Sequence, residues 1–180
     1  IISIYLLASK ERFVSQGKKL LYAFWDTRQA NVIMEDFRLI DSTFGGFISG
    51  KILDSAIIGV LCFVVVSIMK MPYPMLISVI VGVTNIIPFF GPFIGAVPCA
   101  LLILMVNPMQ CLYFIIFIWI LQQFDGNFLG PKILGDSTGL SGFWIIFSIT
   151  IFSGLMGVPG MILGVPIFAV FYALIKRYVN

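Results

Sequence analysis

Histidine does not occur in this 180-residue sequence, and cysteine occurs only at Cys62, Cys99 and Cys111. The lack of histidine removes the commonest metal ligand and the usual general base. The cysteines stand singly in apolar runs without paired spacing, so they predict neither a disulfide framework nor a metal site. No P-loop motif is present, which argues against ATP-driven activity. We therefore expect no catalytic residues, no bound metal and no cofactor.

Charge is also scarce, because only 11% of the residues are charged while 60% are hydrophobic and the mean hydropathy is +1.09. Soluble domains contain roughly 25% charged residues, so this composition predicts an integral membrane protein surrounded by lipid. The net charge of +3 is too small and too dispersed to indicate nucleic-acid binding. Its simplest use is to orient the membrane spans.

The first 50 residues differ from the rest, because eleven of the nineteen charged residues fall between Lys10 and Asp41. Residues 1–8 are apolar and predict the end of a transmembrane helix, and the chain is expected to be the C-terminal part of a larger protein. Residues 9–50 predict two amphipathic helices, broken near residues 26–31. They could lie on the membrane surface, contact a neighbouring subunit, form a cytoplasmic arm, or serve as a solvated linker.

Residues 51–180 predict the transmembrane transport region. An apolar stretch at 75–106 is too long for one straight crossing, since its 32 residues would extend roughly 48 Å as a helix. We expect it to form a broken, re-entrant hairpin, which returns the basic Lys176 and Arg177 to the cytoplasm as the positive-inside rule requires. The fold class is therefore all-α, a polytopic transmembrane helical bundle with an amphipathic helical arm. The other expected spans are 52–69, 109–124, 141–157 and 161–175.

The expected break lies within residues 85–98, inside a run from Met71 to Phe124 that contains no charged residue. A continuous helix cannot keep its hydrogen bonds through Pro88, Gly91, Pro92 and Pro98, because each proline removes a backbone donor and clashes with the preceding turn. We therefore expect the helix to break, at residues 88–92. Irregular backbone at bilayer depth must be buried in protein or face a water-filled cavity. Such a break indicates a transport site or a kink that only helps packing. The candidate pathway residues here are Asn85, Pro88, Gly91, Pro92, Gly95 and Pro98.

A second polar group ends the span at 109–124. Asp125 is the only charged residue between Lys70 and Lys132, and polar groups near bilayer depth suggest a functional site. The alternative is that this group ends the helix among cytoplasmic headgroups. Helical spacing places Gln123 near Asn127 and Gln122 near Asp125. The candidate pathway residues of this group are Gln122, Gln123, Asp125 and Asn127.

Two glycine patterns echo each other along the chain. Gly91 and Gly95 precede Pro98, and Gly160 and Gly164 precede Pro166. Small residues at this spacing allow helices to approach closely, and matching breaks in two halves would suit a transporter built on an internal repeat.

Three motifs then carry a family resemblance: NIIPFFGPFIGAVP at 85–98, QQFDGN at 122–127 followed by Gly130 and Pro131, and GVPGMILGVP at 157–166. In this order they resemble the C-terminal half of the autoinducer-2 exporter family of bacterial permeases. The resemblance implies a homo-oligomeric, multi-pass protein of the bacterial inner membrane that exports small molecules. Some relatives are linked to autoinducer-2, and others are assigned sodium or lithium/proton antiport.

We therefore expect secondary transport of a small polar solute, with Asp125 coupling it to an ion. An ion antiporter and a channel formed by an oligomer are the alternatives. A membrane enzyme is disfavoured, because no acid/base pair is evident and neither Ser78 nor Ser148 has a visible activating partner.

Overall fold

A computed structural model of the chain describes residues 15–16, 19, 22–23, 26–134 and 140–179. These residues are almost entirely helical, and no strand occurs among them. The all-α class predicted from the sequence is therefore confirmed. Residues 1–8, where we expect the end of a membrane helix, lie outside the described residues.

The chain divides into two compact units, residues 1–42 and 43–180. Helix α3 (Thr27–Ile68) contributes residues to both units. It begins within the interruption that the sequence predicts near residues 26–31. In the first unit, most of the predicted amphipathic segment before residue 26 lies outside the described residues.

Helix α3 runs without a break through residues 50 and 51, where the sequence suggested that the arm gives way to the transport region. Lys51 and Asp54 form an ion pair across 2.7 Å at a spacing of i, i+3, and such pairs support a helix. Lys51 and Asp54 therefore form a stabilising pair within α3, and they do not mark the start of a separate helix.

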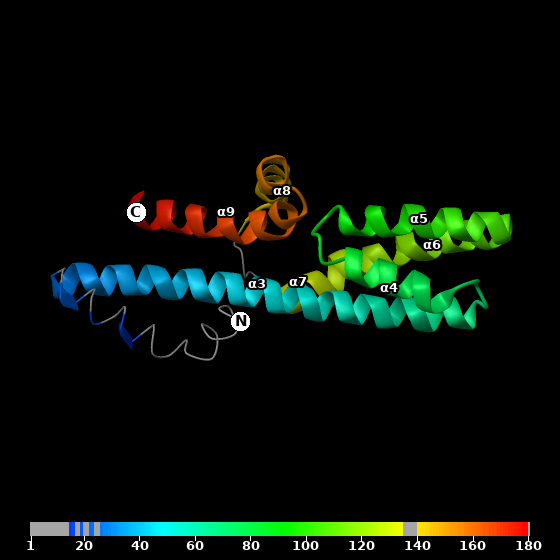
Figure 1. The fold of residues 1–180 in the computed structure, drawn as a ribbon, viewed down its shortest axis with the longest axis horizontal. Coiled ribbons are helices and arrows are strands. Elements are labelled where there is room, and N and C mark those ends of the chain that lie inside the picture. Colours follow the sequence, from blue (N-terminus) through cyan, green and yellow to red (C-terminus); the bar gives the residue numbers. More distant parts are fainter. Residues whose placement is uncertain (1–14, 17–18, 20–21, 24–25, 135–139, 180) are drawn as a thin grey trace. The chain divides into compact units, whose positions relative to one another are not determined.

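The second unit is built around a helical bundle (Figure 1). Helix α5 (Gly91–Val106) packs against both α4 (Pro74–Thr84) and α6 (Pro108–Phe124), and the second part of α3 completes the core. The buried core residues come from these four helices and from the connection between α3 and α4, which contributes Met71. They are Ile58, Cys62, Val66, Met71, Ile77, Val81, Cys99, Ile103, Cys111, Phe114, Ile118 and Leu121.

Helices α4 and α5 form the predicted broken hairpin, with residues 85–90 between them. Pro88 is buried in this turn, and Phe89 adopts a left-handed backbone conformation with φ of 67°. Pro92 occupies the first turn of α5, where a missing N–H costs little. The helix is not broken at Pro98, however, contrary to our expectation. A single interior proline removes one hydrogen bond, and the rest of α5 holds the helix together.

Helix α6 continues directly into a five-residue π-helical turn, η1 (Asp125–Leu129), and then α7 (Gly130–Leu134). Asn107 caps the start of α6 by accepting hydrogen bonds from the backbone nitrogens of Met109 and Gln110, at 3.0 and 3.3 Å. The π-helical turn begins at the polar group predicted from the sequence. Such turns are uncommon and occur frequently at functional sites.

Helices α8 (Gly142–Met156) and α9 (Val158–Val179) form a second hairpin, joined by Gly157. Gly157 has a φ of 63°, a conformation that glycine adopts without strain. Pro166 lies inside α9 as Pro98 lies inside α5.

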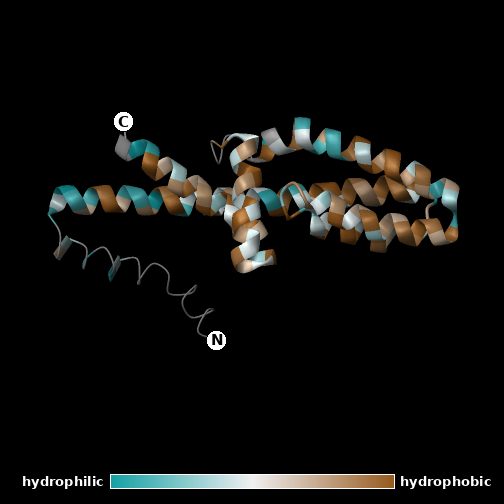
Figure 2. Cartoon of the chain, turned by 90° about the horizontal axis from the view of Figure 1, so that it is seen from above, coloured by the Kyte–Doolittle hydropathy of each residue, from teal (hydrophilic) through white to brown (hydrophobic). Residues whose placement is uncertain are grey.

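By length and composition, three helical segments among the described residues can cross a membrane. They are Thr27–Ile68, Pro108–Leu129 and Val158–Arg177. Figure 2 shows that hydrophobic residues cover most of the bundle helices, with polar residues gathered near their ends. Because so much apolar surface faces outward, the described fold is that of a membrane protein.

The two glycine patterns perform the same packing task in the two hairpins. A Cβ added at Gly91 would lie 2.0 Å from the carbonyl oxygen of Thr84 in α4. A Cβ added at Gly160 would lie 1.9 Å from the carbonyl oxygen of Phe152 in α8. At each position only glycine allows the second helix to approach the backbone of the first so closely.

Candidate functional site

A cavity of about 650 Å³ lies between the hairpin turn, α5, α6 and one side chain of α3. Most of its wall is apolar and aromatic, while its polar residues are Lys51, Asn85, Gln122 and Asp125. Its apolar wall consists of Phe89, Pro92, Phe93, Ala96, Val97, Ala100, Phe114, Ile115, Ile118 and Trp119. The cavity is therefore amphipathic, with a small polar surface beside a large hydrophobic one.

Four buried polar residues form what we call the charged cluster: Lys51, Asn85 and Asp125, which line the cavity, and Asp54, which lies behind them. Asp54 is 0% exposed, Asn85 1%, and Lys51 and Asp125 8% each. Lys51 Nζ donates to Asp54 Oδ2 at 2.7 Å. The Asn85 amide nitrogen lies 3.2 Å from Asp54 Oδ2 and 3.5 Å from Asp125 Oδ2. One amide group thus connects two carboxylates that are 71 residues apart in sequence.

Each member of the charged cluster is positioned by a different local feature. Lys51 and Asp54 share one face of α3 because they are three residues apart. Asn85 is the C-cap residue of α4, so its side chain emerges where the helix ends at the turn. Asp125 begins the π-helical turn after α6. The hairpin break and the π-helical turn therefore bring their polar side chains to one point.

The charged cluster contains buried atoms without a hydrogen-bond partner among the described residues. They are Asp54 Oδ1 and Asp125 Oδ1. The side-chain amide nitrogen of the nearby Gln122 is also buried without a partner. Leaving a buried polar atom unpaired costs about 1–3 kcal/mol, and more for a charged group. Native proteins keep few such atoms, and each one requires an explanation. Both unpaired carboxylate oxygens belong to residues that Asn85 joins, so the unpaired polar atoms of the charged cluster lie close together.

The structure sorts the ten predicted pathway residues into three groups. Asn85, Pro92, Gln122 and Asp125 line the cavity. Pro88, Gly91 and Gly95 are buried where α4 and α5 meet. Pro98, Gln123 and Asn127 are exposed and do not line the cavity.

Gln123 and Asn127 contact each other, as their spacing predicts. The Asn127 amide donates to the Gln123 backbone carbonyl at 2.8 Å and lies 3.2 Å from the Gln123 side-chain oxygen. This pair satisfies its polar atoms locally on an exposed face of the helix. It therefore contrasts with Gln122 and Asp125, which turn toward the cavity.

Lys51 and Asp54 are functional candidates that the sequence analysis did not single out. Their opposite charges at a spacing of i, i+3, followed by an uncharged run to Met69, were the available signal. The i, i+3 spacing alone does not tell whether such an ion pair is buried or exposed. Only the fold shows that α3 carries both residues into the bundle.

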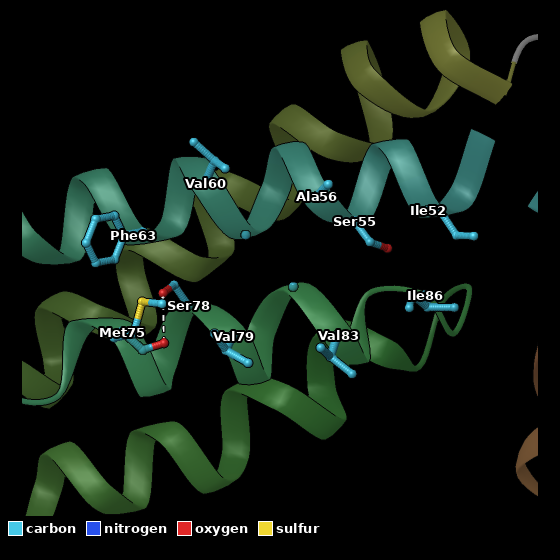
Figure 3. A pocket seen from close by; sticks show the side chains of 12 residues that line it. Ile52, Ser55, Ala56, Val60, Phe63, Met75, Ser78, Val79, Val83 and Ile86 are labelled. Carbon is cyan, nitrogen blue, oxygen red and sulfur yellow. Dashed lines mark hydrogen bonds between the residues drawn. The ribbon is translucent and has the colours of Figure 1, made fainter. Parts of the chain in front are cut away.

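A second cavity of about 540 Å³ lies between α3 and α4, and no charged residue lines it (Figure 3). Gly59 and Gly82 form its floor, where a Cβ added at Gly82 would lie 3.0 Å from Gly59 Cα. Ser78 Oγ donates to the backbone carbonyls of Pro74 and Met75 at 2.8 and 3.0 Å, so its hydroxyl is satisfied within the helix. This groove is a close helix contact with an apolar surface, and it lacks the polar groups of the first cavity.

Comparison with known proteins identifies related sequences. Residues 1–180 match the family described as "AI-2E family transporter". The Bacillus subtilis protein named "Putative transport protein YueF" is 32% identical over 179 residues, which cover 99% of this chain and 47% of that protein. YrrI, a protein of the same organism with a name of the same form, is 37% identical over 143 residues, covering 79% of this chain and 40% of YrrI.

A third relative, YdbI of Bacillus subtilis, is 27% identical over 174 residues, covering 93% of this chain and 48% of YdbI. The chain thus spans about half the length of the curated relatives that it matches. No solved structure matches the chain.

Proposed function

Since the chain belongs to the AI-2E transporter family, we propose that it forms part of a multi-pass secondary transporter that exports a small polar solute. The proposed location is the bacterial cytoplasmic membrane, with the C-terminus in the cytoplasm. Exposed Lys176 and Arg177 near the end of α9 support this orientation under the positive-inside rule. Autoinducer-2 belongs to the solute class that the resemblance implies.

The observation that carries this proposal is the charged cluster at the break of the α4–α5 hairpin. Charged side chains within a membrane span are costly, and they mark ion or substrate pathways when they face a cavity. Here two carboxylates and one ammonium group surround one amide, beside a cavity of about 650 Å³. A structure that needed only packing would place apolar residues at these positions.

Asp125 is the proposed coupling residue. Lys51 and Asp54 neutralise each other through their 2.7 Å contact, which leaves Asp125 as the carboxylate whose charge a proton or a monovalent cation would balance. Asn85 lies between Asp125 and Asp54, at the first position after α4. Occupancy of Asp125 therefore changes the hydrogen bonding of Asn85, and through it the preferred position of the hairpin turn.

Flux measurements test the proposal directly. Full-length protein is reconstituted in proteoliposomes, and solute-driven movement of protons or sodium ions is recorded. Asp125→Asn should abolish coupled flux while the purified protein remains folded and monodisperse. Thr150→Val is the matched control, because it removes a polar group from α8 that hydrogen-bonds only to Ile146 within its own helix. Unchanged coupling in Asp125→Asn would remove Asp125 from the mechanism.

Sodium or lithium/proton antiport is a second candidate function. It is favoured by the two unpaired carboxylate oxygens, Asp54 Oδ1 and Asp125 Oδ1, because hard cations prefer oxygen ligands. Antiport without any organic solute would show sodium-driven proton movement in empty proteoliposomes. Solute export instead requires the solute on one side before protons or ions move.

We also propose that the full-length protein is a homo-oligomer, whose mass in detergent can be measured by light scattering. If the oligomer encloses a pore, planar bilayers will show single-channel current steps. A carrier instead produces slow, saturable flux without such steps.

A further inference from the structure

The shape and charge of the cavity define a narrower class of ligand than a role in transport alone would. We propose that the cavity binds a lipophilic organic cation, a molecule with a single positive charge and an apolar, preferably aromatic, body. The inference rests on the proposed function in one respect, since it takes the same cavity as the substrate site. It replaces the small polar solute of that proposal with an amphipathic cation, and so specifies the sign of the ligand's charge and the character of its body.

The sign follows from how the charged cluster is paired. Lys51 Nζ is held by Asp54 Oδ2 at 2.7 Å, while Asp125 has no ion-pair partner within the described part of the chain. Asp125 lines the cavity, whereas Asp54 is fully buried behind it. A ligand at the polar end of the cavity meets Lys51, which Asp54 neutralises, and Asp125, whose negative charge is left unbalanced and whose buried Oδ1 atom is unpaired.

An anionic ligand fits this arrangement poorly. Lys51 lines the cavity, but Asp54 already neutralises its charge through their 2.7 Å contact, so an anion gains little from it. It would also lie beside Asp125 and be repelled by it. A cation meets neither obstacle, because it pairs with Asp125 and leaves the Lys51 to Asp54 contact intact.

The size and the wall of the cavity select an organic cation over a bare metal ion. Ligand cavities of roughly 300–1,000 Å³ suit drug-sized molecules, and this one measures about 650 Å³. Its wall includes the rings of Phe89, Phe93, Phe114 and Trp119. Aromatic faces attract cations and also bury apolar bodies favourably. A small inorganic ion at Asp125 would leave that aromatic wall without a partner.

A pair of probes with the same shape and opposite charge tests the proposal. Tetraphenylphosphonium and tetraphenylborate are each bound to full-length protein in detergent, and protein-dependent, saturable binding is measured by equilibrium dialysis against protein-free micelles. Asp125→Asn should weaken tetraphenylphosphonium binding at least tenfold. The same variant should leave tetraphenylborate binding unchanged or stronger, because a repulsive charge is removed.

Three further variants keep the result interpretable. Asp125→Glu retains the charge and should retain tetraphenylphosphonium binding within about threefold, which separates loss of charge from misfolding. Trp119→Leu removes one ring of the wall and should weaken binding several-fold, whereas Leu104→Ala, outside the cavity on exposed α5 surface, should have no effect. Equal weakening of both probes by Asp125→Asn would overturn the proposal, as would saturable binding of tetraphenylborate alone.

The outcomes also separate this inference from the proposed function. If tetraphenylphosphonium does not bind while solute-coupled flux still depends on Asp125, the transport site stands and the proposed ligand class is wrong. If tetraphenylphosphonium binds through Asp125 while coupled flux does not depend on that residue, the cation site stands and the coupling role is wrong.

Discussion

The α4–α5 and α8–α9 hairpins use the same packing device but differ in what their turns contain. In both, a glycine near the start of the second helix contacts a backbone carbonyl of the first. The first turn spans residues 85–90 and carries Asn85 into the charged cluster. The second turn consists of Gly157 alone. Close packing of a hairpin is therefore separable from the formation of a site, which here also requires polar residues from α3 and α6.

The largest expected effect is the loss of stability when the close-packed glycine of either hairpin is replaced by a larger residue. Gly91→Val and Gly160→Val each place side-chain atoms against a backbone carbonyl that cannot move aside. We expect a loss of about 3 kcal/mol or more of stability, at or beyond the upper end for overpacking. Thermal unfolding in detergent measures it. Gly154→Ala is the control, since nothing lies within 4 Å of its added Cβ, and equal stability of all three variants would refute the shared packing device.

The next effect is confined to the bundle that holds the first hairpin. Asp54→Leu leaves the buried ammonium of Lys51 without its carboxylate, and breaking such a pair typically costs about 3–5 kcal/mol. The double variant Lys51→Met/Asp54→Leu removes both charges and should recover most of that loss. A double variant as unstable as Asp54→Leu would show that the pair does not determine stability here.

The two turns are compared directly by substituting the key residue of each. Asn85→Leu removes the amide between Asp54 and Asp125 and should cost about 1–3 kcal/mol through unpaired buried groups. Gly157→Ala forces a non-glycine residue into a positive φ and should cost about 1–2 kcal/mol. Only Asn85→Leu should also abolish coupled flux in proteoliposomes. Loss of flux in a folded Gly157→Ala protein would show that the second turn has a functional role too.

The smallest expected effect lies at the start of α6. Asn107→Ala removes the side chain that caps this helix, and losing such a cap typically costs about 1 kcal/mol. The melting temperature should fall slightly while coupled flux is retained, because Asn107 is exposed and does not line the cavity. A loss of flux would extend the site beyond the break of the first hairpin.

The hairpin itself could be predicted from sequence because proline and glycine act locally. Pro88 and Pro92 restrict their own backbone, so a break at residues 88–92 could be predicted from them, and the structure places it at residues 85–90. The failed prediction at Pro98 has the same origin, since a local rule does not include the neighbouring turns that keep α5 helical. Asp125 was found because its charge is isolated within an apolar run.

The pairing of the charged cluster could not be predicted, because it depends on how separate helices meet. Lys51 and Asp54 lie 31 or more residues from Asn85 in sequence, and no local pattern connects them. Likewise, residues 122 and 123 are both glutamine, and only the orientation of α6 about its axis determines that Gln122 lines the cavity. Tertiary packing therefore decided which of the predicted polar residues belong to the site.

The central claim is that the cavity beside Asp125 is a transport site. Such a site must be reached by water within the membrane, so thiol accessibility tests the claim most directly. Ala96→Cys places a thiol in the cavity wall, and Ile94→Cys places one on the outer surface of the same helix two residues away. Wild-type protein gives the background from the buried Cys62, Cys99 and Cys111. A membrane-impermeant methanethiosulfonate reagent applied to membrane vesicles should label Ala96→Cys well above background and Ile94→Cys hardly at all. Equal labelling of the two, or labelling of Ile94→Cys alone, would contradict the account.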